Sequence, residues 1–191
     1  RTGEVIDEVT QAFEGYEFFK FFQLIQNYCV SDLSNFYLDI AKDRLYVSGP
    51  LDKRRRSCQT VMSLIIERLS TLIAPVLPHM AEDIWLNIPY PIKEESVFKR
   101  GWPSVPSNWS KPSLNEHIKH LRNFRTEINR SIEECRSKNY LGSSLEAAIR
   151  IEVNNEKLKD AIGWLNNDGD TQVDNLRDWL LVSKFQLGGE P

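Results

Sequence analysis

Cationic side chains gather in two short stretches of a chain that is otherwise slightly acidic. The 191 residues carry a formal net charge of -3. Six cations face two acids between residues 42 and 56, and six face three between 119 and 138, whereas residues 152–191 carry eight acids and four bases. Lys and Arg hold nucleic-acid backbones, and the planar fork of Arg meets phosphate oxygens bidentately. The segregated charge predicts a docking face for a nucleic-acid backbone.

Three apolar stripes at helical spacing must position these cations. Residues 18–40, 58–72 and 114–135 each place apolar side chains three or four positions apart, which predicts three long amphipathic helices. Asp52 and Ser113 precede two of them and are the expected N-terminal caps. The first cationic stretch therefore spans the end of one long helix and the start of the next.

Shorter elements fill the rest of the first 138 residues. We predict an N-terminal helix that ends near Gly15 and a short helix from about 79 to 88. Five prolines forbid regular structure over residues 89–112. Three aromatic side chains predict that this loop is pinned to the bundle, namely Phe98, Trp102 and Trp109.

After Gly142 the apolar pattern changes to alternation. Residues 147–153 and 179–187 alternate as strands do, and 155–166 indicate a short helix between them. We therefore predict a mainly α fold, a bundle of four to five helices with a small C-terminal α/β subdomain. The predicted domains are residues 1–138, including the loop 89–112, and residues 139–191.

The residue types that usually carry catalysis or metal binding form no convergent set. Cys29, Cys58 and Cys135 lie far apart and each falls on an apolar stripe, which favours core positions in a reducing compartment. His117 and His120 have a spacing compatible with a metal but no third ligand. No apolar run approaches the ~20 residues that span a bilayer. We expect no catalytic residue, no metal, no membrane contact and a cytoplasmic location.

A resemblance narrows the nucleic-acid hypothesis. Residues 36–46 read Phe-Tyr-Leu-Asp-Ile-Ala-Lys-Asp-Arg-Leu-Tyr and residues 55–60 read Arg-Arg-Ser-Cys-Gln-Thr, a block that resembles the anticodon-binding region of isoleucyl-tRNA synthetases. Residues 74–85, Ala-Pro-Val-Leu-Pro-His-Met-Ala-Glu-Asp-Ile-Trp, resemble the helix that follows in that family. Residues 96–103 resemble its aromatic loop. Valyl and leucyl enzymes share the Ala-Pro-x-x-Pro turn, so the run 39–44 is what favours isoleucine.

The resemblance implies a class I aminoacyl-tRNA synthetase, an isoleucine-tRNA ligase that uses ATP. Its catalytic and editing domains would lie upstream, and because residue 1 is Arg we expect an excised piece of the longer chain. Neither catalytic signature, His-Ile-Gly-His or Lys-Met-Ser-Lys-Ser, occurs here. The implied role is binding without catalysis, with no cofactor in this part and with ATP and Mg in the parent enzyme's catalytic domain. The implied partners are the tRNA(Ile) anticodon stem-loop and the upstream domains, in a monomer.

The candidate contacts to tRNA are cations in or beside the predicted helices. Those in the first stretch would clamp phosphates, and those in the second would extend the surface along the stem. They are Lys42, Arg44, Lys53, Arg54, Arg55, Arg56, Arg122, Arg125 and Arg136.

Simpler interpretations remain open for the same residues. The arginine triplet at 54–56 could be a solvated helix start, and Lys42 and Arg44 could complement a helix dipole or pair with nearby acids. The whole region could belong to a valyl or leucyl enzyme, or it could be a helical protein-interaction module that docks through the loop 96–109. Buried loop aromatics would favour the synthetase, and exposed ones the interaction module.

Overall fold

The computed structural model describes residues 1–109, 111–167 and 176–188. The chain forms two compact units, residues 1–110 and 111–191, each of which is considered by itself. The structure is mainly helical with one small parallel sheet, which confirms the predicted fold class. The domain boundary predicted at 138/139 differs from this division, because the long helix after residue 111 packs with the C-terminal elements. No helix among the described residues is long and apolar enough to cross a membrane.

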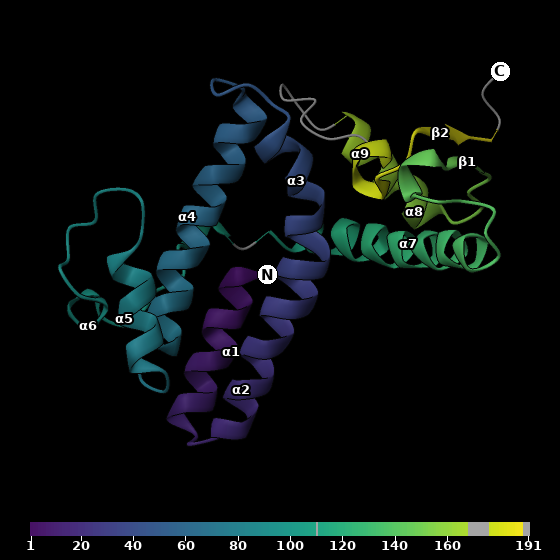
Figure 1. Ribbon diagram of the computed structural model, residues 1–191. Helices are drawn as coiled ribbons and strands as arrows, with labels where there is room; N and C mark the ends of the chain where they lie inside the picture. Colours follow the sequence, from purple (N-terminus) through teal and green to yellow (C-terminus); the bar gives the residue numbers. More distant parts are fainter. Residues whose placement is uncertain (110, 168–175, 189–191) are drawn as a thin grey trace. The chain divides into compact units, whose positions relative to one another are not determined.

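The first unit is a helical bundle whose long helices stand side by side (Figure 1). Its elements in order are α1 (Thr2–Glu14), α2 (Phe18–Asn27), the π-helical segment η1 (Tyr28–Leu38), α3 (Asp39–Tyr46), α4 (Lys53–Ile73), α5 (Pro78–Leu86), α6 (Val97–Arg100) and the 3₁₀ turn η2 (Ser107–Trp109). α1 ends where the sequence predicted, with Gly15 as its C-terminal cap.

α2, η1 and α3 form one continuous rod, because the residues at both junctions keep helical backbone angles. The apolar stripe predicted for residues 18–40 begins with Phe18 and Phe22, four positions apart, but both are exposed and Phe21 is buried instead. Farther along, Tyr28 and Ile40 are buried. Phe21 packs edge-on against Phe13 of α1, with the ring centroids 4.9 Å apart, and spacing along one helix does not predict such a contact with another.

The core of the first unit lies between α1, α2, the C-terminal half of α4, and α5. Val5, Ile6 and Val9 of α1 are completely or almost completely buried, as is Leu72 of α4. Trp85 of α5 is also buried, and its indole N–H donates to the carbonyl oxygen of Glu94, 3.0 Å away. These contacts fix the far ends of α4 and α5 and leave the start of α4 at the surface.

Residues 89–109 are anchored but not buried, and the prediction that residues 89–112 form no regular structure is wrong for α6, for η2 and for the start of α7 at Pro112. The indole N–H of Trp102 donates to Thr10 Oγ1 at 2.8 Å, and a Cβ on Gly3 would lie only 2.9 Å from Val105, so glycine allows this close approach. Even so, Trp102 is 41% exposed and Phe98 is 58% exposed. The pinning predicted from the aromatics is confirmed for Trp102. None of the three loop aromatics is buried, however, so the burial expected to favour the synthetase over an interaction module is not found.

The second unit consists of a long helix and a small α/β layer. Its elements are α7 (Pro112–Ser137), the 3₁₀ turn η3 (Ser144–Glu146), β1 (Ala148–Ile151), α8 (Glu156–Asn167), α9 (Leu176–Leu180) and β2 (Lys184–Leu187). β1 and β2 pair in parallel with Ala148 opposite Lys184. α7 packs against α8 and α9, with Leu121 and Phe124 buried.

Two predictions in this unit are wrong. Pro112 already occupies the first turn of α7 and Lys111 is the residue before it, so Ser113 is not the cap. Alternation predicted a strand from 179, but residues 176–180 form α9 and the strand begins only at Lys184. Trp179 and Leu180 are both buried, which a helix packed on α7 and α8 permits and an alternating strand with one wet face does not.

Candidate nucleic-acid interface

The start of α4 is held by an aspartate cap. Asp52 has extended backbone angles, and its Oδ1 accepts from the backbone N–H of Arg54 at 2.7 Å and of Arg55 at 3.2 Å. These bonds satisfy donors that the first turn of a helix otherwise leaves without partners. The cap predicted from sequence is confirmed, and it fixes the direction in which the first-turn cations project.

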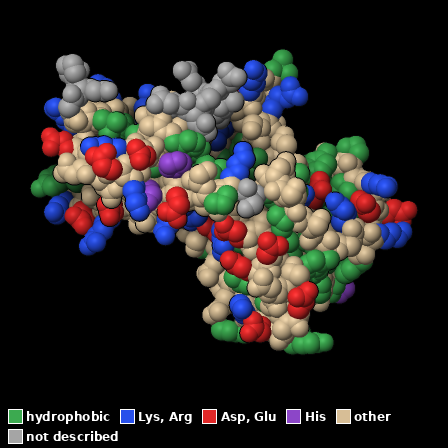
Figure 2. Space-filling view, turned by 180° about the vertical axis from the view of Figure 1, so that it is seen from behind, with side chains coloured by type: hydrophobic (Ala, Val, Ile, Leu, Met, Phe, Trp, Pro, Cys, Tyr) green, Lys and Arg blue, Asp and Glu red, His purple; other side chains and the backbone are tan. Residues whose placement is uncertain are grey.

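The four cations of this turn differ in exposure. Lys53 and Arg56 are exposed, whereas Arg54 and Arg55 are half-buried. Residues three apart lie on the same helix face, so Lys53 and Arg56 form a pair directed to solvent. Arg55 instead donates from its guanidinium to the carbonyl oxygen of Ser48, 3.0 Å away, and ties down the loop before the helix. Figure 2 shows Lys and Arg side chains at the tip where α3 and α4 meet.

The two candidates in α3, Lys42 and Arg44, also differ in accessibility. Lys42 is exposed and forms an ion pair with Asp39 at 3.0 Å, as the simpler interpretation predicted. Such an exposed pair contributes at most about 1 kcal/mol and exchanges readily for another anion. Arg44 is half-buried. Lys42 is therefore the more accessible of the two cations for an approaching phosphate.

The candidates in α7 differ more strongly from one another. Arg125 is only 7% exposed, and its Nε donates to the carbonyl oxygen of Trp179 at 2.8 Å. Arg122 is half-buried, and Arg136 is exposed and paired with Glu133 at 2.6 Å. We therefore leave Arg125 out of the interface that we propose below.

The histidines of α7 also have local contacts. His117 stacks on Trp164 of α8 with the ring centroids 5.6 Å apart and the planes 9° from parallel. His120 lies 3.9 Å from Glu116, one turn earlier in the helix. Both contacts serve packing within the second unit.

A groove that the sequence did not reveal lies beside the cationic turn, where α3 ends. This groove, which we name the tyrosine groove, has a volume of about 790 Å³. Its lining comes from the end of α3, the first half of α4 and the turn after α5. The lining residues are Leu45, Tyr46, Arg55, Gln59, Thr60, Met62, Ser63, Ile66, Pro89 and Tyr90. They are separated by up to 45 positions in the sequence, so no local pattern indicates the groove.

Tyr90 is held in place at the wall of the tyrosine groove. Its hydroxyl lies 3.2 Å from both the carbonyl oxygen of Ser63 and Glu67 Oε1, and its proton can be donated to either. Burial, together with the nearby Glu67 carboxylate, raises the pKa of the Tyr90 phenol above its usual value. The ring is therefore neutral at physiological pH and fixed against α4.

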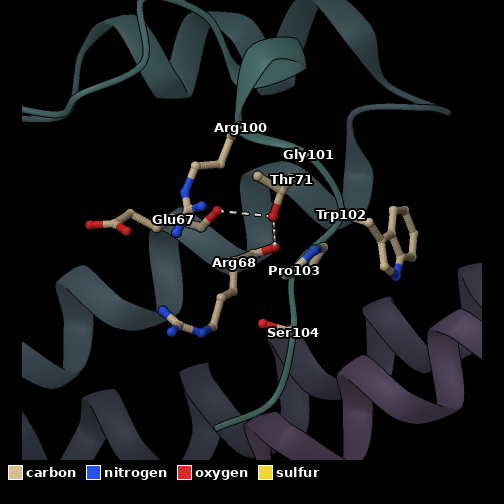
Figure 3. A pocket seen from close by; sticks show the side chains of 8 residues that line it. All are labelled: Glu67, Arg68, Thr71, Arg100, Gly101, Trp102, Pro103 and Ser104. Carbon is tan, nitrogen blue, oxygen red and sulfur yellow. Dashed lines mark hydrogen bonds between the residues drawn. The ribbon is translucent and has the colours of Figure 1, made fainter.

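A second, smaller hollow lies farther along α4 (Figure 3). It has a volume of about 70 Å³ and is lined by Glu67, Arg68, Thr71, Arg100, Gly101, Trp102, Pro103 and Ser104. The guanidinium of Arg68 lies 4.6 Å from the ring centroid of Trp109 and donates to the carbonyl oxygen of Leu64. In Figure 3 the Arg100 side chain reaches towards Glu67, and Trp102 points away from the hollow. A hollow of this size, shared by both signs of charge, suits ordered water better than a nucleotide.

Comparisons with known proteins agree with the nucleic-acid interpretation. The family described as "Anticodon-binding domain of tRNA ligase" matches residues 1–153. The chain is 66% identical to the isoleucine–tRNA ligase of Synechococcus sp. (strain CC9311), 64% to that of Parasynechococcus marenigrum (strain WH8102) and 61% to that of Prochlorococcus marinus (strain MIT 9313). Each match covers the whole chain but 20% of the relative. The chain thus spans about a fifth of the length of these curated relatives.

Proposed function

Because the chain belongs to the family of anticodon-binding domains of tRNA ligases, we propose that it binds the anticodon stem-loop of tRNA(Ile) as part of an isoleucine–tRNA ligase. Its contribution to the reaction is positional. By holding the anticodon end, it lets the acceptor end of the tRNA reach an active site in another part of the enzyme. Isoleucine activation, with ATP and Mg, belongs to that other part.

The exposed pair Lys53 and Arg56 carries the structural argument. Both side chains leave the first turn of α4 on one face, and neither has an ion-pair partner among the described residues. Phosphate groups of an RNA backbone would replace solvent around them, with release of counterions. Lys42 and Arg44 at the end of α3, and Arg54 and Arg55 behind the pair, add positive charge to the same tip.

In the second unit, we assign contacts with the stem only to Arg122 and Arg136. Arg136 is the more accessible, since its ion pair with Glu133 lies at the surface. A phosphate that displaces the Glu133 carboxylate would keep the guanidinium charge paired. Arg122 is half-buried and offers a smaller accessible surface.

An NMR titration of the 191-residue chain tests both binding and specificity. The probes are an RNA hairpin with an isoleucine anticodon loop and a second hairpin that has the same stem and a valine anticodon. We expect the isoleucine hairpin to bind more tightly and to shift the amide signals of Lys53 and Arg56 most. Equal affinities for the two hairpins would contradict the isoleucine specificity, and binding of neither hairpin at low salt would contradict RNA binding itself.

A further inference from the structure

We propose that the tyrosine groove is a base-binding subsite, which receives one unstacked nucleobase from the loop of the bound RNA hairpin. This inference rests on the proposed function, because it specifies where the hairpin loop is recognised. The cationic turn would hold the backbone, and the groove would hold the base attached to it.

The walls of the groove suit a flat aromatic ring. Tyr46 and Tyr90 both line it; Tyr46 is 84% exposed, and Tyr90 is fixed by its hydroxyl contacts to α4. Leu45, Met62 and Ile66 contribute apolar surface to the same lining. Unpaired bases in RNA loops are commonly stacked on aromatic side chains. An exposed tyrosine beside an apolar hollow provides that kind of surface.

Two polar side chains in the lining of the groove, Gln59 and Thr60, suit the edge of a base. Gln59 is exposed, and its side-chain amide has no hydrogen-bond partner among the residues that the structure describes. An amide offers both donors and an acceptor, as the edges of bases require. Thr60 lies next to it, and its hydroxyl donates to the carbonyl oxygen of Arg56, which leaves the oxygen lone pairs available as acceptors.

The spacing along α4 connects the groove to the cationic turn. Arg56 and Gln59 are three residues apart in α4 and are therefore neighbours on the surface of the helix. A step of three residues advances about 5 Å along the helix. A nucleotide whose phosphate contacts Arg56 therefore has its base within reach of Gln59 and the tyrosine groove. This adjacency of positive charge and apolar hollow favours a nucleic-acid loop over a protein segment as the occupant.

A cycle that combines protein variants with altered RNA tests the subsite directly. The affinity of the 191-residue chain is measured for the isoleucine hairpin and for a set of hairpins, each lacking the base at one loop position. The same set is measured with Tyr46→Ala, and circular dichroism verifies that the variant is folded. Tyr46→Phe keeps the aromatic face. Phe19→Ala is the matched control, because Phe19 is an exposed aromatic in the same unit, and α2 begins at the opposite end of the bundle from the α3–α4 tip (Figure 1).

We expect Tyr46→Ala to weaken binding of the intact hairpin about 5- to 100-fold, the range of one base stacked on an aromatic side chain. The loss should disappear for the hairpin that lacks one particular base, and Tyr46→Phe and Phe19→Ala should bind as the unaltered chain does. Gln59→Ala should show a smaller loss that disappears with the same base. This second variant keeps the test decisive if Tyr46→Ala disturbs the fold.

Failure of the subsite is distinguishable from failure of the proposed function. If the unaltered chain binds the hairpin and Tyr46→Ala weakens all hairpins equally, or none, the groove holds no base although RNA binding stands. If the unaltered chain binds no hairpin at low salt, the proposed function itself is wrong and the subsite falls with it. A peptide that occupies the groove without competing with RNA would also overturn the inference.

Discussion

In α4 the cations of the first turn lie at or near the surface, whereas Arg125 in the middle of α7 is buried and bonded to the backbone of α9. Each helix carries five Lys and Arg side chains in the sequence, although α7 also carries four acids and α4 only one. The two groups of cations differ in their position along the helix. A first turn projects its side chains beyond the packed region, while the middle of α7 faces α8 and α9 over much of its length.

This comparison shows that a cationic cluster is not by itself a binding surface. The contact of Arg125 with Trp179 satisfies a carbonyl oxygen at the C-terminal end of the short helix α9, where helix carbonyls lack partners within the helix. Arg125 in this position stabilises the fold and is not available to contact RNA. The asymmetry between the two helices leads to predictions for stability in one unit and for binding in the other.

The largest effect on stability is expected at Arg125. Arg125→Ala should lower the free energy of unfolding of the second unit by about 1.5–3 kcal/mol, because a buried hydrogen bond from a charged group is lost. Urea denaturation, followed by circular dichroism, measures the change. Arg136→Ala is the matched control in the same helix and should cost less than about 1 kcal/mol, since its ion pair is exposed. Equal costs for the two variants would contradict the assigned difference.

The cap of α4 should have an intermediate effect, this time in the first unit. Asp52→Ala removes the acceptor of two backbone N–H groups and should destabilise the unit by about 1 kcal/mol. Asp52→Asn keeps a good capping side chain and should recover most of that loss. Thermal unfolding of both variants provides the measurement. An Asn variant as unstable as the Ala variant would show that the charge, rather than the cap, matters.

The smallest effect concerns the pH dependence contributed by Tyr90. Its pKa is raised in the folded state, so the folded protein holds this proton more tightly than the unfolded chain does. The unfolding free energy should be unaffected below the tyrosine pKa of the unfolded chain, and it should fall as pH rises through the folded-state pKa. Tyr90→Phe should remove this part of the alkaline dependence. An identical alkaline profile for the variant would mean that Tyr90 does not contribute.

Local signals in the sequence predicted several elements of both units. The apolar stripe from residue 58 and the aspartate at 52 placed α4 correctly, because amphipathic spacing and capping depend only on neighbouring residues. The strand β1 and the helix α8 were also close to the predicted ranges. The same local reasoning identified the exposed pair Lys53 and Arg56 as part of a larger candidate set.

Features that depend on distant partners could not be predicted in the same way. The burial of Arg125 requires α9, more than 50 residues later in the chain. The tyrosine groove requires side chains from the end of α3, from α4 and from the turn after α5 to lie around one hollow. Alternation at 179–183 suggested a strand, yet the packing of α9 against α7 and α8 decided for a helix over residues 176–180. Tertiary contacts thus determined what periodicity left open.

The most direct test of the proposed interface is the salt dependence of hairpin binding between about 50 and 200 mM salt. For the double variant Lys53→Ala and Arg56→Ala, the slope of log affinity against log salt should become shallower by about 1.5, since each lost phosphate contact removes roughly 0.7–0.9. The control with the same change in charge is Lys20→Ala with Lys99→Ala, two exposed cations of the same unit that pair with Glu17 and Glu95. The control should keep the slope of the unaltered chain. Equal slopes for all three proteins would contradict the account.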